Sequence, residues 1–255
     1  MKLTILGSGT TDPTTRRNEP GYLLEIDNNL LLLDAGSGTK EHITEAGYDY
    51  LKISHILISH THTDHVADLP ALFWSWKVRK KSKDVLILGP KGINKFIDKM
   101  IKAFFPNFKK SASFNLKIKE MHNSIYQAKN WQVKSVFTWR QGSTLIPYAL
   151  AFRIKHKGKS FVYGADMCFD YPKSLVKISK NADLLLIESA FPNQKKQWDH
   201  LTPSQAGKLA TEAKVKKLVL THFYPPCEKY DIKKQAQKTY KGQIVLAKDL
   251  MKIEI

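Results

Sequence analysis

One short run of the sequence constrains the fold more than any other, His60-Thr61-His62-Thr63-Asp64-His65. It follows Ile53–Ser59, an apolar stretch with β-branched residues that predicts a buried strand. In an extended segment leaving this strand, residues two apart point the same way, so the first two histidines can face one point. The aspartate and the third histidine follow beyond a bend and can serve a neighbouring point. We therefore expect a strand that ends beside a cluster of ionisable side chains.

The side chains of this run are ligand types for transition metals. Imidazole and carboxylate bind zinc, or manganese and iron where carboxylate predominates. The chain has nine histidines in 255 residues, so three of them within six positions is a marked concentration. A polar loop with a capping aspartate is the alternative explanation, and it does not account for the spacing. The run therefore favours a metal site.

Short apolar runs and helical patterns alternate along the rest of the chain. Predicted strands are Lys2–Leu6, Tyr22–Ile26, Leu30–Leu33, Val85–Leu88, Phe161–Tyr163, Leu184–Ile187, Leu218–Leu220 and Ile244–Leu246, and the stretch from Phe114 to Ile154 is mostly extended. Predicted helices lie near Ala67–Lys80, Ile93–Phe104, Tyr171–Lys180, Pro203–Ala213 and Lys229–Tyr240. Since no repeat or Pro/Gly/Ser linker interrupts this order, a single domain, residues 1–255, is the simplest division. The order suits two mixed sheets packed face to face with helices outside.

The charge balance is strongly basic, with 41 Lys+Arg against 23 Asp+Glu and a formal net charge of +18. Two explanations remain open: a solvated lysine-rich surface, or a polyanionic partner whose phosphates release counterions on binding. Basic clusters occur at Lys77–Lys81, Lys109-Lys110, Lys155–Lys159 and Lys214–Lys217. Because they are spread along the whole chain, charge alone does not locate a binding face.

Cysteine content and hydropathy indicate the compartment. Two cysteines, Cys168 and Cys227, are too few for a disulfide framework, which favours a reducing cytoplasm. The start, Met1–Gly7, lacks the charged region and long apolar core of a signal peptide. No run approaches the ~18 apolar residues of a membrane span, so no membrane association is expected.

The segment Ile56–Pro70, which contains the histidine run, resembles the signature loop of the metallo-β-lactamase superfamily. Motifs along nearly the whole chain resemble its ribonuclease Z branch: Leu6–Thr10 with Pro13 and Arg17-Asn18, Leu33–Gly36, Gly89–Gly92, Tyr163–Asp166, Ile187–Phe191, His200–Thr202 and Leu220–Phe223. The resemblance implies an α/β fold of four layers, an αββα sandwich of two mixed β-sheets flanked by helices. It places metal ions at the sheet edges.

The resemblance also implies metal ligands by position. His60 and His62 would hold one ion, Asp64, His65 and His222 a second, and Asp166 would bridge both. The cofactor would be Zn²⁺, up to two ions, with manganese or iron as alternatives. The two distant ligands each follow a predicted strand, where a rigid element supports them.

Three residues have implied catalytic roles. Glu188 and His200 resemble a carboxylate–histidine pair that protonates the leaving oxygen, and Asp64 would orient the attacking water. A histidine oriented by a carboxylate is a suitable general acid near neutral pH. The alternatives are a salt bridge at a strand end for Glu188 and a position beside a helix cap for His200.

Two departures from the ribonuclease Z pattern stand out. A further histidine for the first metal is expected in the region Val136–Thr144, where this chain has none; Arg140 stands near that place and could instead contact a substrate phosphate. The nearest histidines, His122 and His156, do not fit the pattern. The flexible arm with which ribonuclease Z clasps tRNA is also absent, because the next predicted strand follows Arg153-Ile154 almost at once.

The leading functional hypothesis is a ribonuclease Z-like, metal-dependent phosphodiesterase, with tRNA processing implied by the resemblance and weakened by the missing arm. Its partner would be RNA or a small phosphodiester. One alternative is a small-molecule hydrolase on the same site, acting on a cyclic nucleotide, aryl sulfate, lactone or β-lactam. Another is a non-catalytic RNA-binding module with a degenerate site. A homodimer is expected only by analogy with relatives.

Overall fold

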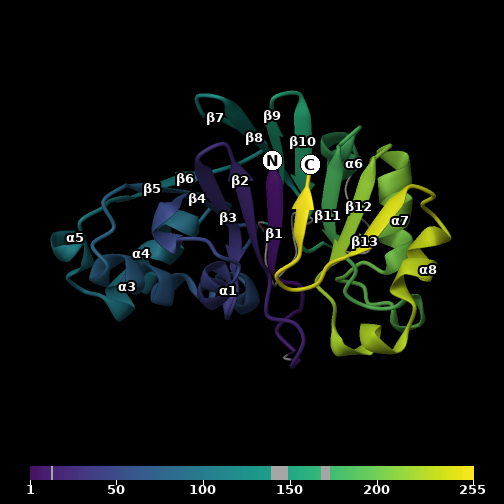
Figure 1. The fold of residues 1–255 in the computed structure, drawn as a ribbon, viewed down its shortest axis with the longest axis horizontal. Coiled ribbons are helices and arrows are strands. Elements are labelled where there is room, and N and C mark those ends of the chain that lie inside the picture. Colours follow the sequence, from purple (N-terminus) through teal and green to yellow (C-terminus); the bar gives the residue numbers. More distant parts are fainter. Residues whose placement is uncertain (13, 139–148, 168–172) are drawn as a thin grey trace.

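The computed structural model describes residues 1–12, 14–138, 149–167 and 173–255. Within them two seven-stranded sheets pack face to face (Figure 1). The first has the order β14-β1-β2-β3-β4-β5-β6 and contains β1 (Lys2–Gly7), β2 (Gly21–Ile26), β3 (Asn29–Ala35), β4 (Ile53–Leu57), β5 (Val85–Gly89), β6 (Leu116–Glu120) and β14 (Lys252–Glu254). The second has the order β13-β12-β11-β10-β9-β8-β7 and contains β7 (Ile125–Gln127), β8 (Trp131–Phe137), β9 (Leu150–His156), β10 (Lys159–Tyr163), β11 (Leu184–Glu188), β12 (Lys217–Thr221) and β13 (Gln243–Leu246).

Both sheets are mixed. In the first, the pairs from β14 through β3 are antiparallel and those from β3 through β6 are parallel. In the second, the pairs from β7 through β10 are antiparallel and those from β10 through β13 are parallel. The predicted strands near Tyr22–Ile26 and Leu30–Leu33 form β2 and β3, which pair as a hairpin with Asp27 in the left-handed region (φ 49°) at its turn.

Helices cover the outer face of each sheet, so the predicted four-layer αββα arrangement is confirmed (Figure 1). The first sheet is covered by α1 (Thr39–Glu45), α3 (Leu69–Val78) and α4 (Ile93–Phe104), and the second by α6 (Lys173–Ser179), α7 (Pro203–Glu212) and α8 (Ile232–Gln237). Two short helices, α2 (Thr63–Val66) and α5 (Phe108–Ser111), complete the first half. Between the sheets lies an apolar core that includes the fully buried Leu24, Leu57, Phe152 and Phe161.

The carboxyl ends of several strands meet at one edge of the sandwich. In the second sheet β10, β11 and β12 run parallel, and Glu188 at the end of β11 pairs with Thr221 at the end of β12. The two sheets are joined near this edge, because the N–H of Leu150 in β9 donates to the carbonyl of Ser59, just after β4 (2.9 Å). Polar residues that follow β4, β10, β11 and β12 therefore lie close together.

Most predicted elements form near their expected positions, with a few differences. The helix expected near Ala67–Lys80 begins later, as α3, and the separate helix α2 precedes it. Neither α1 nor β14 was predicted. The helix α1 begins after a left-handed glycine and has no capping side chain, and β14 is only three residues long. The expected start of α7 forms with a capping box, in which the Thr202 N–H donates to Gln205 Oε1 (2.7 Å). Among the described residues no helix is both long and apolar enough to cross a membrane.

Candidate metal centre and active site

His60 and His62 lie just after β4, as predicted, and their rings converge. The Nε2 atom of His60 is 3.0 Å from Nδ1 of His62, and the two rings meet edge to face. His60 is 2% exposed, whereas His62 faces solvent. The structure places His60 in a group of metal-ligating atoms with His65 and Asp166, whereas His62, which is open to water, belongs to no such group in the described chain.

Asp64 and His65 lie on α2, and the fold brings His222 to them from the end of β12. Asp64 Oδ2 is 3.7 Å from Nε2 of His65 and 3.4 Å from Nε2 of His222. All three side chains are buried. Their ligand atoms lie within 4.8 Å of one another, which is the size of a single ion site. His222 reaches this point with its backbone in the left-handed region (φ 59°).

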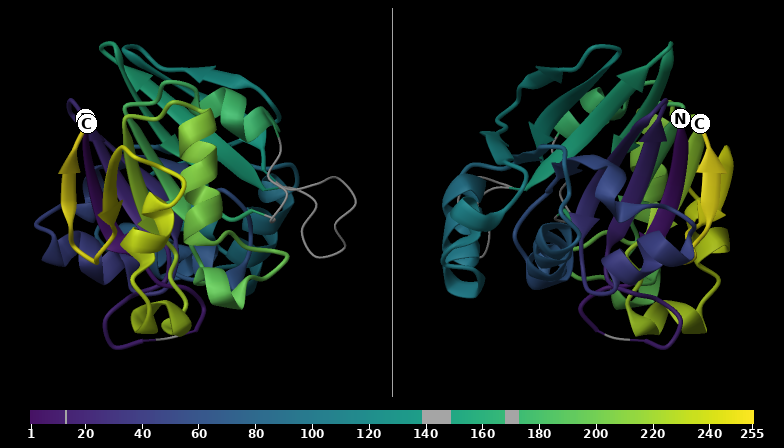
Figure 2. Two further views of the ribbon diagram at one scale, coloured as in Figure 1. Left: turned by 90° about the vertical axis from the view of Figure 1, so that its right-hand side faces the viewer. Right: turned by 60° about the vertical axis from the view of Figure 1, so that its left-hand side comes forward.

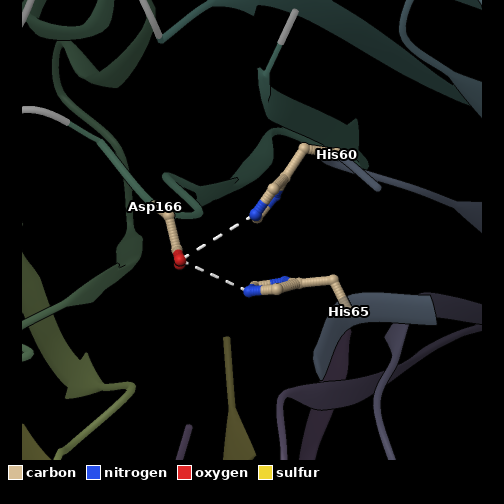
Figure 3. Close-up of side chains that lie close together, drawn as sticks. All are labelled: His60, His65 and Asp166. Carbon is tan, nitrogen blue, oxygen red and sulfur yellow. Dashed lines mark ion pairs between the residues drawn. The ribbon is translucent and has the colours of Figure 1, made fainter. Parts of the chain in front are cut away.

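Asp166 occupies the centre of the cluster, in the loop after β10. Its Oδ2 atom is 3.9 Å from Nε2 of His60, 3.4 Å from Nε2 of His65 and 3.2 Å from Nε2 of His222. Figure 3 shows the imidazoles of His60 and His65 turned toward this carboxylate from the opposite side of the site. One carboxylate thus faces three histidines, among them members of both predicted ion sites.

Unsatisfied nitrogen atoms provide a test of whether this cluster suits a metal. The Nε2 atoms of His65 and His222 are buried and have no hydrogen-bond partner within the described residues. They lie 3.2–3.4 Å from Asp166 Oδ2, but without hydrogen-bond geometry. Buried polar atoms are normally paired, and leaving one unpaired costs about 1–3 kcal/mol. Lone pairs and carboxylate oxygens directed at a common centre fit a bound cation, so the donor set suits a metal.

The electrostatics of Asp166, His60 and His62 agree with this description. Although burial raises the pKa of Asp166, the nearby His222 and His65 hold it well below its usual range. Burial is the main cause that lowers the pKa of His60 and of His62, which keeps both imidazoles neutral. Ionised carboxylates and neutral imidazoles are the states in which these groups bind metals. Burial lowers the pKa of His65, but nearby Asp166 and Asp34 outweigh it and raise that pKa well above its usual range, so metal binding must displace a proton from His65.

Asp34, at the end of β3, positions the ligands and was not assigned a role from the sequence. Its carboxylate accepts hydrogen bonds from His65 Nδ1 (2.8 Å), the Ser59 hydroxyl (2.6 Å) and the Tyr163 hydroxyl (2.5 Å). The Ser59 hydroxyl also lies 2.9 Å from His60 Nδ1. A hydrogen bond at Nδ1 leaves Nε2 free for the metal, so Asp34 sets the tautomer of His65. A carboxylate at the end of an apolar, buried strand is the signal that could have identified it.

Glu188 and His200 form the predicted pair. Glu188 Oε2 is 2.7 Å from His200 Nδ1, and Oε1 accepts the Met167 N–H (2.6 Å) next to Asp166. Glu188 is 1% exposed, and burial raises its pKa. Burial lowers the pKa of His200, but the adjacent Glu188 outweighs this effect and raises it to about 9. His200 also shares a group of ligand atoms with Asp166 and His222, so its free edge faces the centre.

An aromatic wall, not predicted from the sequence, stands beside His200. The rings of Phe191 and Tyr224 stack with centroids 4.5 Å apart and an interplanar angle of 15°. The ring of Tyr224 meets that of His200 edge to face, with centroids 5.6 Å apart, and its centroid lies 6.1 Å from that of His222. Both wall residues are partly exposed, so they offer a surface to the organic part of a substrate.

The remaining predicted position falls outside the described residues, since Arg140 belongs to the stretch 139–148. The two histidines near the pattern lie elsewhere. His122 packs edge-on against Phe137 (4.5 Å), and His156 binds the Asn130 carbonyl and Asp27. Neither belongs to a group of metal-ligating atoms in the described part of the chain.

The sequence profile of the family described as Anti-Pycsar protein Apyc1 matches residues 1–245. The chain belongs to this family. It is also 28% identical to the ribonuclease Z of Prochlorococcus marinus strain MIT 9301, over 100% of both proteins. In structure it resembles the short form of human tRNase Z, ELAC1 (TM-score 0.81, 23% identity, 100% of this chain and 99% of that one). The Bacillus subtilis metallo-beta-lactamase fold protein YhfI is similar as well (TM-score 0.80, 24% identity, 100% and 99%).

These comparisons confirm the predicted resemblance to ribonuclease Z and the metallo-β-lactamase fold of this Apyc1 family member. Together with the His/Asp groups they confirm the predicted class, a metal-dependent hydrolase.

Proposed function

We propose that the chain is a phosphodiesterase in which His60 and His62 hold one metal ion, Asp64, His65 and His222 hold a second, and Asp166 bridges the two. The observation that carries this proposal is the pair of buried Nε2 atoms, on His65 and His222, that have no hydrogen-bond partner in the described chain and face two carboxylates. Zinc is the proposed metal, because imidazole nitrogen and carboxylate oxygen are its common protein ligands.

When bound, the metal lowers the pKa of a water molecule toward ~7 and offsets negative charge that develops on phosphorus-bound oxygens. The protein residues then divide the remaining work. Asp64 accepts a hydrogen bond from the attacking water and so orients it. His200 carries a proton on Nε2, since Glu188 occupies its Nδ1 side at 2.7 Å. That proton goes to the departing oxygen as its bond to phosphorus breaks.

The substrate class follows from the relatives and from one feature of the fold. Relatives named ribonuclease Z support a phosphodiester bond in RNA as the target. However, β9 ends at His156 and β10 begins at Lys159, so only a two-residue turn stands where the tRNA-clasping arm is expected. The short turn favours a second candidate for the substrate, a small phosphodiester such as a cyclic nucleotide, whose base would lie against the Phe191–Tyr224 wall.

The proposal includes further features that the sequence favours. One domain spans residues 1–255, the protein works in the cytoplasm, and it forms a homodimer as its relatives are expected to do. The two-cysteine content supports the compartment. Sedimentation of the purified protein tests the homodimer directly.

Metal titration of chelator-treated protein, followed by calorimetry, tests the ligand assignment. Because no histidine occurs at the expected place near Arg140 and His62 is exposed, the first site should bind more weakly than the second. We expect two binding steps of unequal affinity, or a single step. Two equally tight steps would contradict the assignment.

Hydrolysis of bis(p-nitrophenyl) phosphate, a lactone and a β-lactam under one zinc condition tests the reaction. We expect metal-dependent cleavage of the phosphodiester. Efficient opening of the lactone or lactam without any phosphodiester cleavage would refute the proposal, and salt-sensitive RNA binding without turnover would identify the non-catalytic alternative. Cleavage of a cyclic nucleotide but not of RNA would select the second candidate.

A further inference from the structure

Two neighbouring hollows lie at the end of the second sheet that is farthest from the metal centre. One, of about 470 Å³, is lined by residues of β8, β9, β10 and the β9–β10 turn. The other, of about 370 Å³, lies where the end of α6 meets β8 and β9. Both share Gln132, Arg153, Lys155 and Asn181, so they form one elongated depression. Figure 2 shows strands β7–β10 in teal at the top of the molecule in both views.

The position of this depression follows from the direction of the strands. Asp166 follows the carboxyl end of β10, whereas Lys159 begins that strand. Six residues separate the two, four of them in β10, so the distance is at most roughly 20 Å. On β8 and β9 the residues with inward side chains, such as Val133 and Phe152, belong to the core between the sheets. The alternate residues Gln132, Lys134, Arg153 and Lys155 therefore line the opposite, outer face.

The lining of the depression is cationic and almost free of acid. The smaller hollow is lined by Lys134, Arg153, Lys155, Lys177 and Lys180, with the amides of Gln132 and Asn181, and none of the described residues that line it is a carboxylate. Among the described residues, the larger hollow adds Lys157, Lys159 and Lys216 and a single lining carboxylate, Asp183. Lys157 is itself paired with Asp27, whose carboxylate lies 2.9 Å from its ammonium. The Asp183 carboxylate is 2.9 Å from the Lys216 ammonium and 4.0 Å from the Lys159 ammonium, so its charge is already offset.

Arg153 gives the depression a fixed charge. Its guanidinium donates to the carbonyls of Ile178 (2.8 Å) and Lys180 (2.7 Å) and to the Ser160 hydroxyl (2.9 Å), all of them neutral acceptors. Its Nε is buried without a hydrogen-bond partner in the described chain, and no described carboxylate lies within 4.0 Å of it. A partly buried charge is normally paired. Here the positive charge is held rigidly, and Asp183 reaches it only at longer range and through the shared Ser160 hydroxyl, so the guanidinium still offers its charge to a bound anion.

We propose that this depression, defined by Lys134, Arg153, Lys155, Lys177 and Lys180 and extended by Lys157, Lys159 and Lys216, is a second binding site that takes the phosphate backbone of a single-stranded nucleic acid. An elongated row of cations with side-chain amides matches a chain of phosphates spaced along a strand. Lysine ammonium groups neutralise single phosphates, and the amides donate hydrogen bonds to their oxygens. Because no acid of the described chain lines the smaller hollow, a phosphate there meets no like charge from these residues.

The test compares two variants with the same change in net charge. The groove variant carries Lys155→Glu, Lys177→Glu and Lys180→Glu. The control carries Lys95→Glu, Lys208→Glu and Lys233→Glu, three exposed lysines on α4, α7 and α8. Binding of a fluorescein-labelled oligouridylate is followed by anisotropy in chelator, so that no cleavage intervenes. The same sequence in DNA and vesicles of anionic lipid are run in parallel.

We expect the groove variant to bind the oligonucleotide at least ~10-fold more weakly than the control. The slope of the logarithm of its binding constant against the logarithm of the salt concentration should be shallower by about 2, because each of the three lost phosphate contacts removes about 0.7 from the slope for single strands. Similar weakening of RNA and DNA supports recognition of the backbone. An equal loss in both variants would mean that only overall charge matters, and binding to lipid vesicles without binding to either oligonucleotide would also overturn the inference.

Two further measurements keep the result independent of folding and of the proposed activity. A second groove variant with Lys→Gln at the same three positions removes charge without adding repulsion, and should weaken binding in the same direction. Zinc-dependent hydrolysis of bis(p-nitrophenyl) phosphate reports on the metal centre. If that hydrolysis is absent in the parent protein, the proposed function fails, while the binding comparison still decides the fate of the second site.

Discussion

At the carboxyl end of β10 the chain buries Asp166 among three histidines, whereas at its amino end Lys159 opens onto a depression lined by lysines. The first end is preorganised, because Asp34 and Glu188 fix the ligand-bearing residues through hydrogen bonds of 2.6–2.8 Å. The second end has one rigid cation, Arg153, surrounded by exposed, flexible side chains. Chemistry on a single phosphorus atom needs fixed geometry, whereas holding a flexible chain of phosphates needs only charge of one sign.

The largest effect should come from Asp64→Asn. This change keeps the size of the side chain but removes a charge that lies 3.4 Å from His222 Nε2 and is proposed both to hold metal and to orient water. We expect turnover of bis(p-nitrophenyl) phosphate to fall by at least ~10². The melting temperature in chelator should hardly change, and Asp49→Asn is the matched exchange at an exposed position. Turnover close to that of the parent would remove Asp64 from the active site.

His200→Gln tests the leaving-group role. For a phosphodiester with an alkyl leaving group, kcat should fall by about 10², because the departing alkoxide needs a proton. The p-nitrophenolate group leaves without one, so the p-nitrophenyl substrate should be much less affected. His122→Gln, at an exposed histidine against Phe137, is the control. Equal losses on both substrates would assign His200 to metal binding, which its place beside Asp166 and His222 allows.

The Glu188–His200 pair should also make the stability of the metal-free protein depend on pH. The folded pKa of His200 is about 9, above the 6.5 of an unperturbed histidine, so the folded state binds the proton more tightly. This stabilisation is complete below pH ~6.5 and is lost as the pH rises through about 9. It amounts to roughly 3 kcal/mol. Urea unfolding in chelator should show a larger decline over this window for the parent than for His200→Gln, and parallel curves would contradict the pairing.

Asp34→Asn should have a smaller effect, on metal affinity. The amide can still accept from Ser59 or Tyr163 but presents a weaker partner to His65 Nδ1, so zinc should bind about 10-fold more weakly. Asp249→Asn is a matched control, because that carboxylate also accepts several hydrogen bonds, from Ser8 and Asn18, but none from a proposed metal ligand. Calorimetric titration with zinc measures the metal affinity of both variants. Equal losses in the two variants would mean that Asp34 acts only through folding.

The smallest effect should be that of the groove variant on a small substrate. Of its three lysines, Lys155 pairs with Ser160 near the start of β10 and so lies roughly 20 Å from the metal centre by strand length, and Lys177 and Lys180 line the same depression. Because exposed charges are screened beyond ~8 Å at physiological salt, hydrolysis of bis(p-nitrophenyl) phosphate should change by less than about twofold. A larger fall in kcat, with unchanged zinc affinity, would show that the two ends of the sheet are coupled.

The local features of the fold were predictable from sequence because they repeat over a few residues. Apolar runs predicted the strands on which the site depends, including β4, β10, β11 and β12, and the helical pattern of Pro203–Ala213 predicted α7. The histidine run placed two imidazoles on one side of an extended segment, which the 3.0 Å approach of His60 to His62 reproduces. The helix α1 and the strand β14 escaped because each is short and has weak end signals.

The sequence by itself therefore determined the strand-and-helix order, the ligand types and the resemblance that assigned Asp166 and His222. Only the tertiary structure decided which groups meet: that Asp34 joins His65, Ser59 and Tyr163, and that Lys155, Lys177 and Lys180 gather around Arg153. The reason is physical. Periodicity and turn chemistry act between near neighbours in the chain, whereas these contacts join residues tens to more than a hundred positions apart, once two sheets pack on a common core and align their strand ends.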